Sequence, residues 1–206
     1  FTQVSLGIDG MILVNASTFD DGSYDNCSPV TFKARRMDTN NCQSNSSFYD
    51  QVKFCCEDIG DTLTVIFRVY DVDIAPGDVA LDFEELNAND CMVQVFVDDK
   101  IKPSCLAPAN VTVSCENFDP SLWAYGQPTV TDNCCVDTVT STVNLSAFDS
   151  LCNKGTIIRR FTAVDCAGQQ TQCSQRIIVN YEQDYYVRFP NDVIVTFCDS
   201  SGVYGE

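Results

Sequence analysis

The feature that most constrains the fold is an internal repeat with a spacing of roughly eighty residues. In its second copy, an Asp-Asn-Cys triplet at 132–134 precedes an alternating run at 156–165 that ends on an aspartate. In the first copy, the same triplet at 25–27 precedes the run 62–71, which also ends on an aspartate. Self-similarity at one spacing is typical of tandem arrays, so the sequence predicts a string of small domains rather than one large domain.

The spacing divides the chain into two units and the start of a third. We expect one unit over residues 1–100 and a second over 101–181, each close to the size of a small sandwich domain. Residues 182–206 are expected to be a linker and the first strand of a further copy, because Pro190–Cys198 echoes Pro108–Cys115. We expect the first unit to be truncated at its N-terminus and the chain to be a piece of a longer protein.

Strand signals recur between turn signals along the chain, and no stretch has a helical periodicity of useful length. Two alternating segments flank Asp9-Gly10, a dipeptide that favours a tight hairpin, so a strand pair is expected there. Val136–Leu145 alternates and is rich in Thr and Val, which favours an antiparallel sheet with one solvent-facing side. The sequence therefore predicts an all-β fold of tandem immunoglobulin-like β-sandwich domains that follow one another as a rod.

Thirteen cysteines in 206 residues predict a disulfide-rich chain in an oxidising, extracellular setting, at a cell surface or in a surface filament. Metal binding is the alternative explanation for so many thiols. The chain has no histidine, however, and the adjacent pairs Cys55-Cys56 and Cys134-Cys135 lack the spacing of zinc sites. The sequence has neither a signal peptide nor a long apolar segment, so no membrane span is expected in it.

The formal net charge of −17 argues against nucleic acid as a partner, because its phosphates would be repelled. A solvated surface and the binding of cations explain this charge equally well. Calcium takes several carboxylate and carbonyl oxygens, whereas the alternative is that each aspartate hydrogen-bonds within its own turn. The candidate calcium ligands are Asp20, Asp21 and Asp25; Asp71, Asp73 and Asp78; and the linker pair Asp98 and Asp99, with Asp132 or Asp165 as further ligands.

No enzymatic activity and no organic cofactor are expected. A serine or cysteine nucleophile needs a base, which is usually histidine, and the chain has none. Many carboxylates are present, but no motif marks a pair of them as catalytic.

The second unit resembles the hyalin-repeat (HYR) family of immunoglobulin-like domains, in particular the cysteine-rich versions in large secreted surface proteins of Bacteroidota. The residues that carry the resemblance are Pro103–Val113, the Asp-Asn-Cys triplet at 132–134, the segment Ala163–Gly168, and the closing Cys173 with the run after it. The first unit departs from this pattern by two insertions and by lacking Ala-Gly after Asp71. The resemblance implies the fold, but such modules serve adhesins, gliding machinery and filaments alike.

The resemblance also implies a set of disulfides. In the family, the cysteine before the first strand pairs with the one before the last strand, and the Asp-Asn-Cys cysteine pairs with the one before the central strand. The implied bonds are Cys105–Cys173 and Cys134–Cys152 in the second unit, and Cys27 with Cys55 or Cys56, and the other of these two with Cys42, in the first. Cys91 then needs a partner upstream of Phe1, and the partners of Cys115, Cys135, Cys166 and Cys198 stay open.

Two kinds of glycosylation motif occur. Asn-x-Ser/Thr sequons are frequent by chance in a chain rich in these residues, and they lie at Asn15, Asn26, Asn45, Asn110 and Asn144. The resemblance to Bacteroidota proteins implies O-glycosylation at Asp-Ser/Thr-apolar motifs instead, which places candidates at Thr62, Thr138 and Ser150. Thr62 lies in an expected strand, so Thr138 and Ser150 are the preferred sites.

Two functions are compatible with these features. The first is a structural repeat module of a long extracellular filament or adhesin, stiffened by disulfides and by calcium, with further copies of the same repeat as partners. Joining of subunits by strand addition from Pro190–Cys198 is a variant of it. The second is a recognition module for a glycan or protein, which would use the Asp71–Cys91 insertion or the loop with Trp123 and Tyr125.

Overall fold

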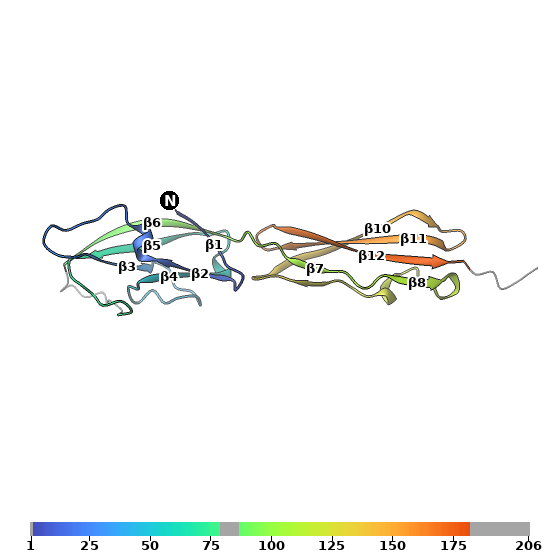
Figure 1. Cartoon of the computed structure of the whole chain (residues 1–206), viewed down its shortest axis with the longest axis horizontal. Coiled ribbons are helices and arrows are strands. Elements are labelled where there is room, and N and C mark those ends of the chain that lie inside the picture. Colours follow the sequence, from blue (N-terminus) through green and yellow to red (C-terminus); the bar gives the residue numbers. More distant parts are fainter. Residues whose placement is uncertain (1, 79–86, 182–206) are drawn as a thin grey trace, which may run out of the picture.

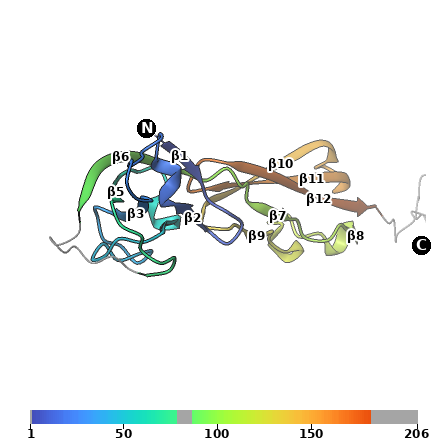
Figure 2. The same cartoon turned by 60° about the vertical axis from the view of Figure 1, so that its left-hand side comes forward.

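The computed structural model describes residues 2–78 and 87–181 as two elongated units that lie end to end (Figure 1). A second view, turned by 60°, shows the same linear arrangement (Figure 2). The predicted third copy and Cys198, and residues 79–86 of the insertion, lie outside the described residues. No strand pairing joins the two units within the described ranges, so each unit has its own sheets.

The first unit consists of a four-stranded sheet and a two-stranded sheet. The larger sheet has the order β1-β6-β5-β3 and the smaller pairs β2 with β4. The six strands are β1 (Thr2–Ser5), β2 (Met11–Asn15), β3 (Thr31–Arg36), β4 (Gln51–Cys55), β5 (Thr62–Tyr70) and β6 (Ala88–Asp98). Two 3-10 turns, η1 (Ala16–Phe19) and η2 (Cys56–Asp58), follow β2 and β4.

The second unit repeats the large sheet of the first, but its small sheet is built from strands at other places in the chain. Its larger sheet has the order β10-β11-β12-β8, and its smaller sheet pairs β7 with β9. The strands are β7 (Ser104–Leu106), β8 (Val111–Ser114), β9 (Thr129–Thr131), β10 (Val136–Asp149), β11 (Lys154–Asp165) and β12 (Gln170–Asn180), and the 3-10 turns are η3 (Cys115–Asn117) and η4 (Trp123–Tyr125).

The repeat in the sequence corresponds to equivalent strands in space. β1 runs parallel to β6 and β8 runs parallel to β12, whereas the remaining pairs of both large sheets are antiparallel. Phe67 on β5 lies opposite Cys91 on β6, as Phe161 on β11 lies opposite Cys173 on β12. The chain is therefore an all-β, disulfide-rich protein of tandem immunoglobulin-like β-sandwiches, as the sequence predicts.

The hairpin predicted at Asp9-Gly10 is wrong. The turn forms, since the Gly10 N–H donates to the Gly7 carbonyl at 3.0 Å. The strands on either side of it then separate, because β1 pairs with β6 in one sheet and β2 pairs with β4 in the other. The turn therefore carries the chain from one layer of the sandwich to the other.

Each unit buries its own apolar core between the layers. The first core contains Val14 and Phe54 from the small sheet and Val65 and Val95 from the large one. The second core is smaller, with Ile157, Ile177 and Val179 from the large sheet and Tyr125 from η4. These strands alternate between buried and exposed positions as a half-covered sheet requires.

Strand β10 differs from its predicted pattern of one buried and one solvent-facing side. Only Phe148 of its fourteen residues is not exposed. The small sheet consists of two strands of three residues, of which β7 contacts β11 and β12 and β9 contacts β10, so this layer leaves most of β10 uncovered. The Val and Thr pattern thus identifies the strand but not the extent of the layer facing it.

The first unit also buries an ion pair beside its core. The Arg36 guanidinium donates to both carboxylate oxygens of Asp58, at 2.7 and 2.8 Å, and both side chains are buried. Asp58 also accepts the Cys55 N–H at 3.0 Å and the Asn40 amide at 2.7 Å. Burial lowers the pKa of Arg36, but hydrogen bonds to Asp58 and Asp38 outweigh it and raise the pKa overall. Asp58 therefore holds together β3, η2 and the loop between β3 and β4.

Candidate functional site

The most developed site of the described chain is the junction between the two units. It is formed by Gly10 in the β1–β2 turn, Cys56 in η2, Asp99 in the linker, and Asn133 and Cys134 in the turn before β10. These residues come from four separate segments, which the fold brings together where β6 leaves the first unit (Figure 1).

A disulfide between Cys56 and Cys134 crosses this junction. Its Cα atoms are 5.3 Å apart and its cysteines are separated by 78 positions in the sequence. The half-buried Cys134 packs against the core of the first unit. The two units are therefore joined twice, once by the linker and once by this bond.

Gly10 allows the units to approach closely. Its φ of +71° lies in the left-handed region that favours glycine. A Cβ atom at this position would lie 2.6 Å from the Cys56 sulfur and 2.8 Å from the Asn133 carbonyl oxygen. Any side chain here would push the second unit away from the first.

Hydrogen bonds fix the linker against the Asp-Asn-Cys turn. The Asn133 amide donates to Asp99 Oδ2 at 3.0 Å and to the Gly7 carbonyl at 3.3 Å. Asp99 is 1% exposed, and its Oδ1 accepts the Ile101 N–H at 3.0 Å. A charge-assisted hydrogen bond shielded from water is stronger than one on the surface, so it favours a single orientation of the linker.

The adjacent cysteine pairs divide their bonds between units. Cys55 bonds Cys42 within the first unit, while its neighbour Cys56 bonds across the junction. Cys135 bonds Cys166 within the second unit, while its neighbour Cys134 bonds across the junction. Three disulfides therefore follow one another in series, separated only by the peptide bonds of the two pairs.

A fourth disulfide, Cys105–Cys173, joins β7 to β12. This is the bond that the family resemblance implies. The bonds implied for Cys134 with Cys152 and for Cys27 with Cys55 or Cys56 are wrong. The reason is that the Asp-Asn-Cys turn and the cysteine before the central strand lie at opposite ends of a unit, too far apart to bond within it. The bond of Cys42 with Cys55 satisfies the remaining expectation.

Four cysteines of the described residues are free. Cys27, Cys91 and Cys152 are exposed, and Cys115 is partly buried. The bridge across the junction was missed in the sequence, although the adjacent pairs signalled it. Neighbouring side chains on extended backbone point in opposite directions, so two adjacent cysteines tend to reach different partners.

The carboxylates predicted as calcium ligands mostly serve local structure. Asp20 accepts the N–H groups of Gly22 and Ser23. Asp25 accepts those of Cys27 and Ser28, and these bonds lower the pKa of its carboxyl group. Asp98 Oδ2 accepts the amide of Gln3 at 3.2 Å.

Of the predicted group Asp71, Asp73 and Asp78, only Asp71 is linked to another candidate ligand, and that ligand is Asp25 of a different predicted group. The Ser28 hydroxyl lies 2.5 Å from Asp71 Oδ1 and 3.2 Å from Asp25 Oδ2, and thus links these two carboxylates. The main-chain carbonyl of Asp78 accepts a hydrogen bond from the buried Lys33 ammonium. The side chains of Asp21 and Asp73 make no hydrogen bond to another described residue. Calcium binding by these residues stays a prediction.

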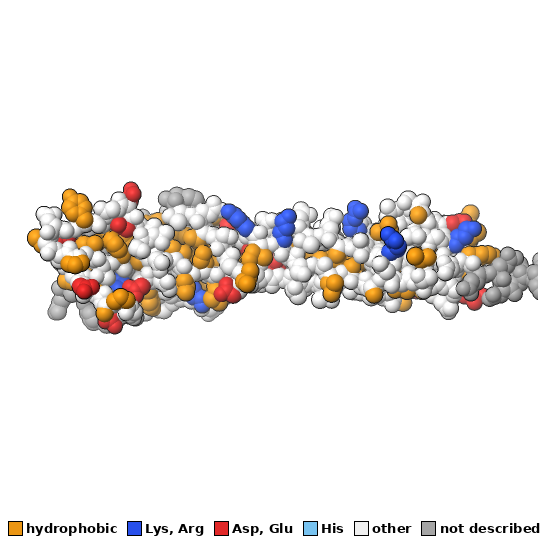
Figure 3. Space-filling model, viewed as in Figure 1, with side chains coloured by type: hydrophobic (Ala, Val, Ile, Leu, Met, Phe, Trp, Pro, Cys, Tyr) orange, Lys and Arg blue, Asp and Glu red, His pale blue; other side chains and the backbone are white. Residues whose placement is uncertain are grey.

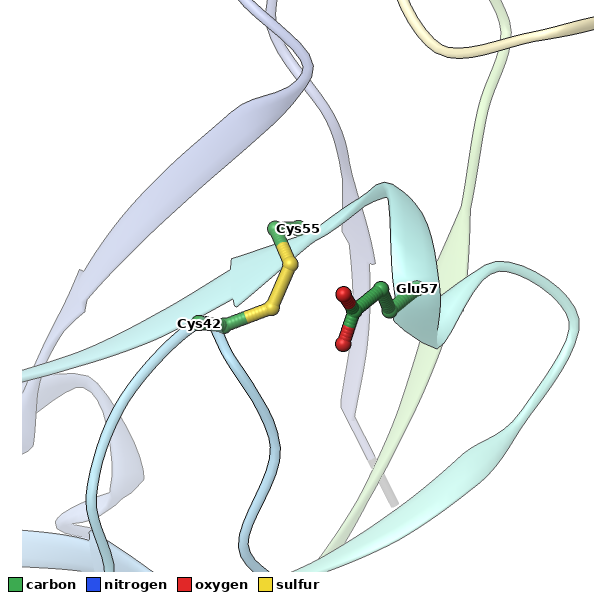
Figure 4. A group of neighbouring side chains, drawn as sticks. All are labelled: Cys42, Cys55 and Glu57. Carbon is green, nitrogen blue, oxygen red and sulfur yellow. A yellow bond between two sulfur atoms is a disulfide. The ribbon is translucent and has the colours of Figure 1, made fainter.

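One close group of potential metal ligands occurs in the described part of the chain, formed by Cys42, Cys55 and Glu57 (Figure 4). Their ligand atoms lie within 4.8 Å of one another. The two sulfurs are bonded to each other, however, so they are not thiolates. Disulfide formation therefore explains this cluster.

The surface residues predicted for glycosylation and recognition are largely accessible. Thr62, Thr138, Ser150 and Asn144 are exposed, whereas Asn45 is half-buried and donates to the Met37 carbonyl. Trp123 is 73% exposed, while Tyr125 beside it is buried and its hydroxyl accepts the Asp119 N–H. Hydrophobic side chains are scattered along the face in Figure 3 rather than gathered in one groove.

Comparisons with known proteins show no family for this chain. No protein-family model matches the chain, and no curated protein matches it. Among solved structures, it is similar to the protocadherin gammaB7 EC3-6 cis-dimer, at 14% identity and a TM-score of 0.28 over 82% of this chain. It is also similar to the human desmocollin-1 ectodomain, at 13% identity and a TM-score of 0.26 over 74% of this chain. The chain spans 49% and 35% of those two chains, and likenesses this distant carry no argument.

No helix in the described ranges is long and apolar enough to cross a membrane. The strands and disulfides thus define a tandem β-sandwich protein whose two units are bonded to each other.

Proposed function

We propose that the chain is a structural repeat module of a long extracellular filament or adhesin of the cell surface. The observation that carries this proposal is the Cys56–Cys134 disulfide between successive units. Disulfides persist in oxidising compartments, and four of them in one chain support an extracellular location. Bonds within a unit would suffice for stability, whereas a bond between units constrains their relative position.

The series of disulfides supports a mechanical role. From Cys42 to Cys166, the shortest covalent path uses three disulfides and two peptide bonds. With Cα separations of 5.9, 5.3 and 5.8 Å across the bonds, this path is only about 25 Å long. Force would therefore pass from Cys42 to Cys166 through covalent bonds, so the segments that these disulfides close cannot be drawn out.

The junction supports a stiff connection between units. Gly10 lets the units touch, and Asn133 binds both the linker and the β1–β2 turn. A disulfide combined with buried hydrogen bonds removes the freedom that a single short linker would retain. Units joined in this way keep the rod straight.

The proposal predicts a narrow distribution of angles between the units. Replacing the junction bond by Cys56→Ser with Cys134→Ser is expected to widen this distribution and to reduce the maximum dimension seen by small-angle X-ray scattering. The matched control, Cys42→Ser with Cys55→Ser, removes a disulfide within one unit and should leave the angle unchanged. An oxidised wild-type chain that already samples a broad range of angles would contradict the proposal.

Recognition of a glycan or protein is the second candidate function, and the exposed Trp123 indole favours it. Electron microscopy of the native material distinguishes the two. Regular filaments support the structural module, whereas isolated molecules with saturable ligand binding, lost in Trp123→Ala, support recognition.

We also infer that the junction binds calcium. Three buried side-chain oxygens near it, Asp132 Oδ1, Asn133 Oδ1 and Asp165 Oδ2, lack a hydrogen-bond partner, and a hard cation would satisfy them. Asp99 adds a buried carboxylate, although no three carboxylates in the described chain have ligand atoms within 4.8 Å of one another. Amide and carbonyl oxygens would therefore have to complete the site.

Calcium is then expected to raise the melting temperature, by an amount equivalent to about 2.7 kcal/mol when its concentration is a hundred times the dissociation constant. Asp165→Asn should abolish this rise, and Asp149→Asn, which changes an exposed aspartate far from the junction, should not. Titration calorimetry that detects no binding, together with an unchanged melting temperature, would refute the site.

A further inference from the structure

Two of the free cysteines lie at opposite ends of the molecule in positions that correspond to the two halves of the junction bridge. The first is Cys27. In its turn, Asp25 Oδ2 accepts the N–H groups of Cys27 and Ser28 at 2.7 and 2.8 Å. In the junction turn, Asp132 Oδ2 accepts those of Cys134 and Cys135 at 2.9 and 3.2 Å. Cys27 and Cys134 therefore hold the same place in the same turn.

The two turns differ in what covers them. Residues 132–134 are half-buried because the first unit covers them, whereas residues 25–27 are exposed. Cys27 carries a free thiol and Cys134 is bonded. The first unit thus presents, uncovered, the surface that the second unit uses to attach to its predecessor.

The other cysteine is Cys152. Cys56 lies in the connection that enters β5, and Cys152 lies in the connection that enters β11, the equivalent strand of the second unit. Both connections are at the end where the chain leaves the unit, since Thr62 pairs with Phe96 near the end of β6 and Gly155 pairs with Val179 near the end of β12. Figure 1 shows the β10–β11 connection beside the end of β12.

A cavity lies at the same end of the second unit as Cys152. This cavity of about 610 Å³ lies between the β10–β11 connection and the end of β12, and it is lined by residues that include Phe148, Asp149, Gly155, Val179 and Tyr181. In the first unit, the corresponding end holds the Asp-Asn-Cys turn of the second unit. Within the described residues, no such turn covers this end of the second unit.

We propose that Cys152 of one copy of this chain forms a disulfide with Cys27 of a second copy, so that the copies join head to tail through the same type of bridge as Cys56–Cys134. This inference rests on the proposed function and names the contact by which the modules assemble. The Cys152 end carries one cation, Lys154, and one anion, Asp149, and the Cys27 turn carries Asp20, Asp21 and Asp25, so Lys154 is the group that could pair with this turn.

The bond requires an oxidant, for which a small-molecule disulfide such as oxidised glutathione suffices. The Cys27 thiolate attacks oxidised glutathione, forms a mixed disulfide and releases one glutathione thiol. The Cys152 thiolate of the second copy then attacks the Cys27 sulfur and releases the second glutathione thiol. Two protein thiols lose two electrons, and one glutathione disulfide is reduced to two thiols.

The test uses the full chain in a glutathione redox buffer, followed by non-reducing electrophoresis and mass spectrometry of linked peptides. Wild type should form a ladder of oligomers that contains the Cys27–Cys152 peptide pair. Cys27→Ser and Cys152→Ser should each remain monomeric alone, and their mixture should give dimers and nothing longer. The control Cys91→Ser removes another exposed free thiol and should leave the ladder intact.

A wild-type chain that stays monomeric, or a ladder that persists in Cys27→Ser, would overturn the inference. The same preparations separate this outcome from a failure of the proposed function. The Cys56–Cys134 bond and the narrow angle distribution should be present in Cys27→Ser and Cys152→Ser. Their loss would contradict the structural module itself, whatever the ladder shows.

Discussion

Reduction of the disulfides is expected to lengthen the chain under force by about 400 Å. In the oxidised chain, the bonds Cys42–Cys55, Cys56–Cys134 and Cys135–Cys166 exclude three segments from the stretched path. These segments, residues 43–54, 57–133 and 136–165, make up most of both units. Optical tweezers with handles at the two chain ends would measure the extra length when a reductant is added.

Removing one disulfide at a time gives more specific expectations for the extension under force. Without the junction bond, in Cys56→Ser with Cys134→Ser, the shortest path runs along the backbone to Cys105 and crosses to Cys173. The oxidised variant should therefore extend about 150 Å further than wild type. The control, Cys105→Ser with Cys173→Ser, leaves the series intact and should show no added length. An oxidised wild-type chain that extends as far as the reduced one would show that the series does not form.

Removing the carboxylate of Asp58 is expected to destabilise the first unit by about 3–5 kcal/mol. Asp58→Ala leaves the buried Arg36 without its bidentate partner and the Cys55 N–H without an acceptor. An unpaired buried charge is more costly than the loss of an exposed ion pair, because no water replaces the missing partner. Denaturant unfolding under oxidising conditions measures the change.

The neighbouring carboxylate provides the control for this prediction. Asp38 also contacts Arg36, at 2.8 Å, but its side chain is 43% exposed. Asp38→Ala should therefore cost only about 1 kcal/mol or less. Equal losses of stability in the two variants would mean that the Arg36–Asp58 pair has no special role in the first unit.

The β-sandwich repeat was predictable because its signals are local. Alternation in segments such as Thr62–Tyr70 marks a strand whichever partner it meets, and the Asp-Asn-Cys turn closes on its own carboxylate. Two copies of one pattern therefore predict two similar units. The same locality explains why the hairpin predicted at Asp9-Gly10 is wrong. The turn forms from local residues, but the strands on either side of it pair with strands far along the chain.

The junction was not predictable because its residues meet only after both units have folded. Cys56 and Cys134 are separated by 78 positions, and nothing near either of them specifies the other. The adjacent pairs indicated that each cysteine of a pair has its own partner. Whether Cys56 reaches Cys134 depends on how the two units are placed relative to each other, and no local sequence pattern specifies that placement.

The bridge between the units also changes what a protease can do to the molecule. The linker from Asp99 to Pro103 is the thinnest point between the two sandwiches, and a cut there would ordinarily release them from each other. Here both fragments stay tethered, because the bond between Cys56 and Cys134 encloses that whole stretch of chain. Separating the two units therefore requires both a protease that cleaves the linker and a reductant that breaks this disulfide, and the two seldom act together outside a cell.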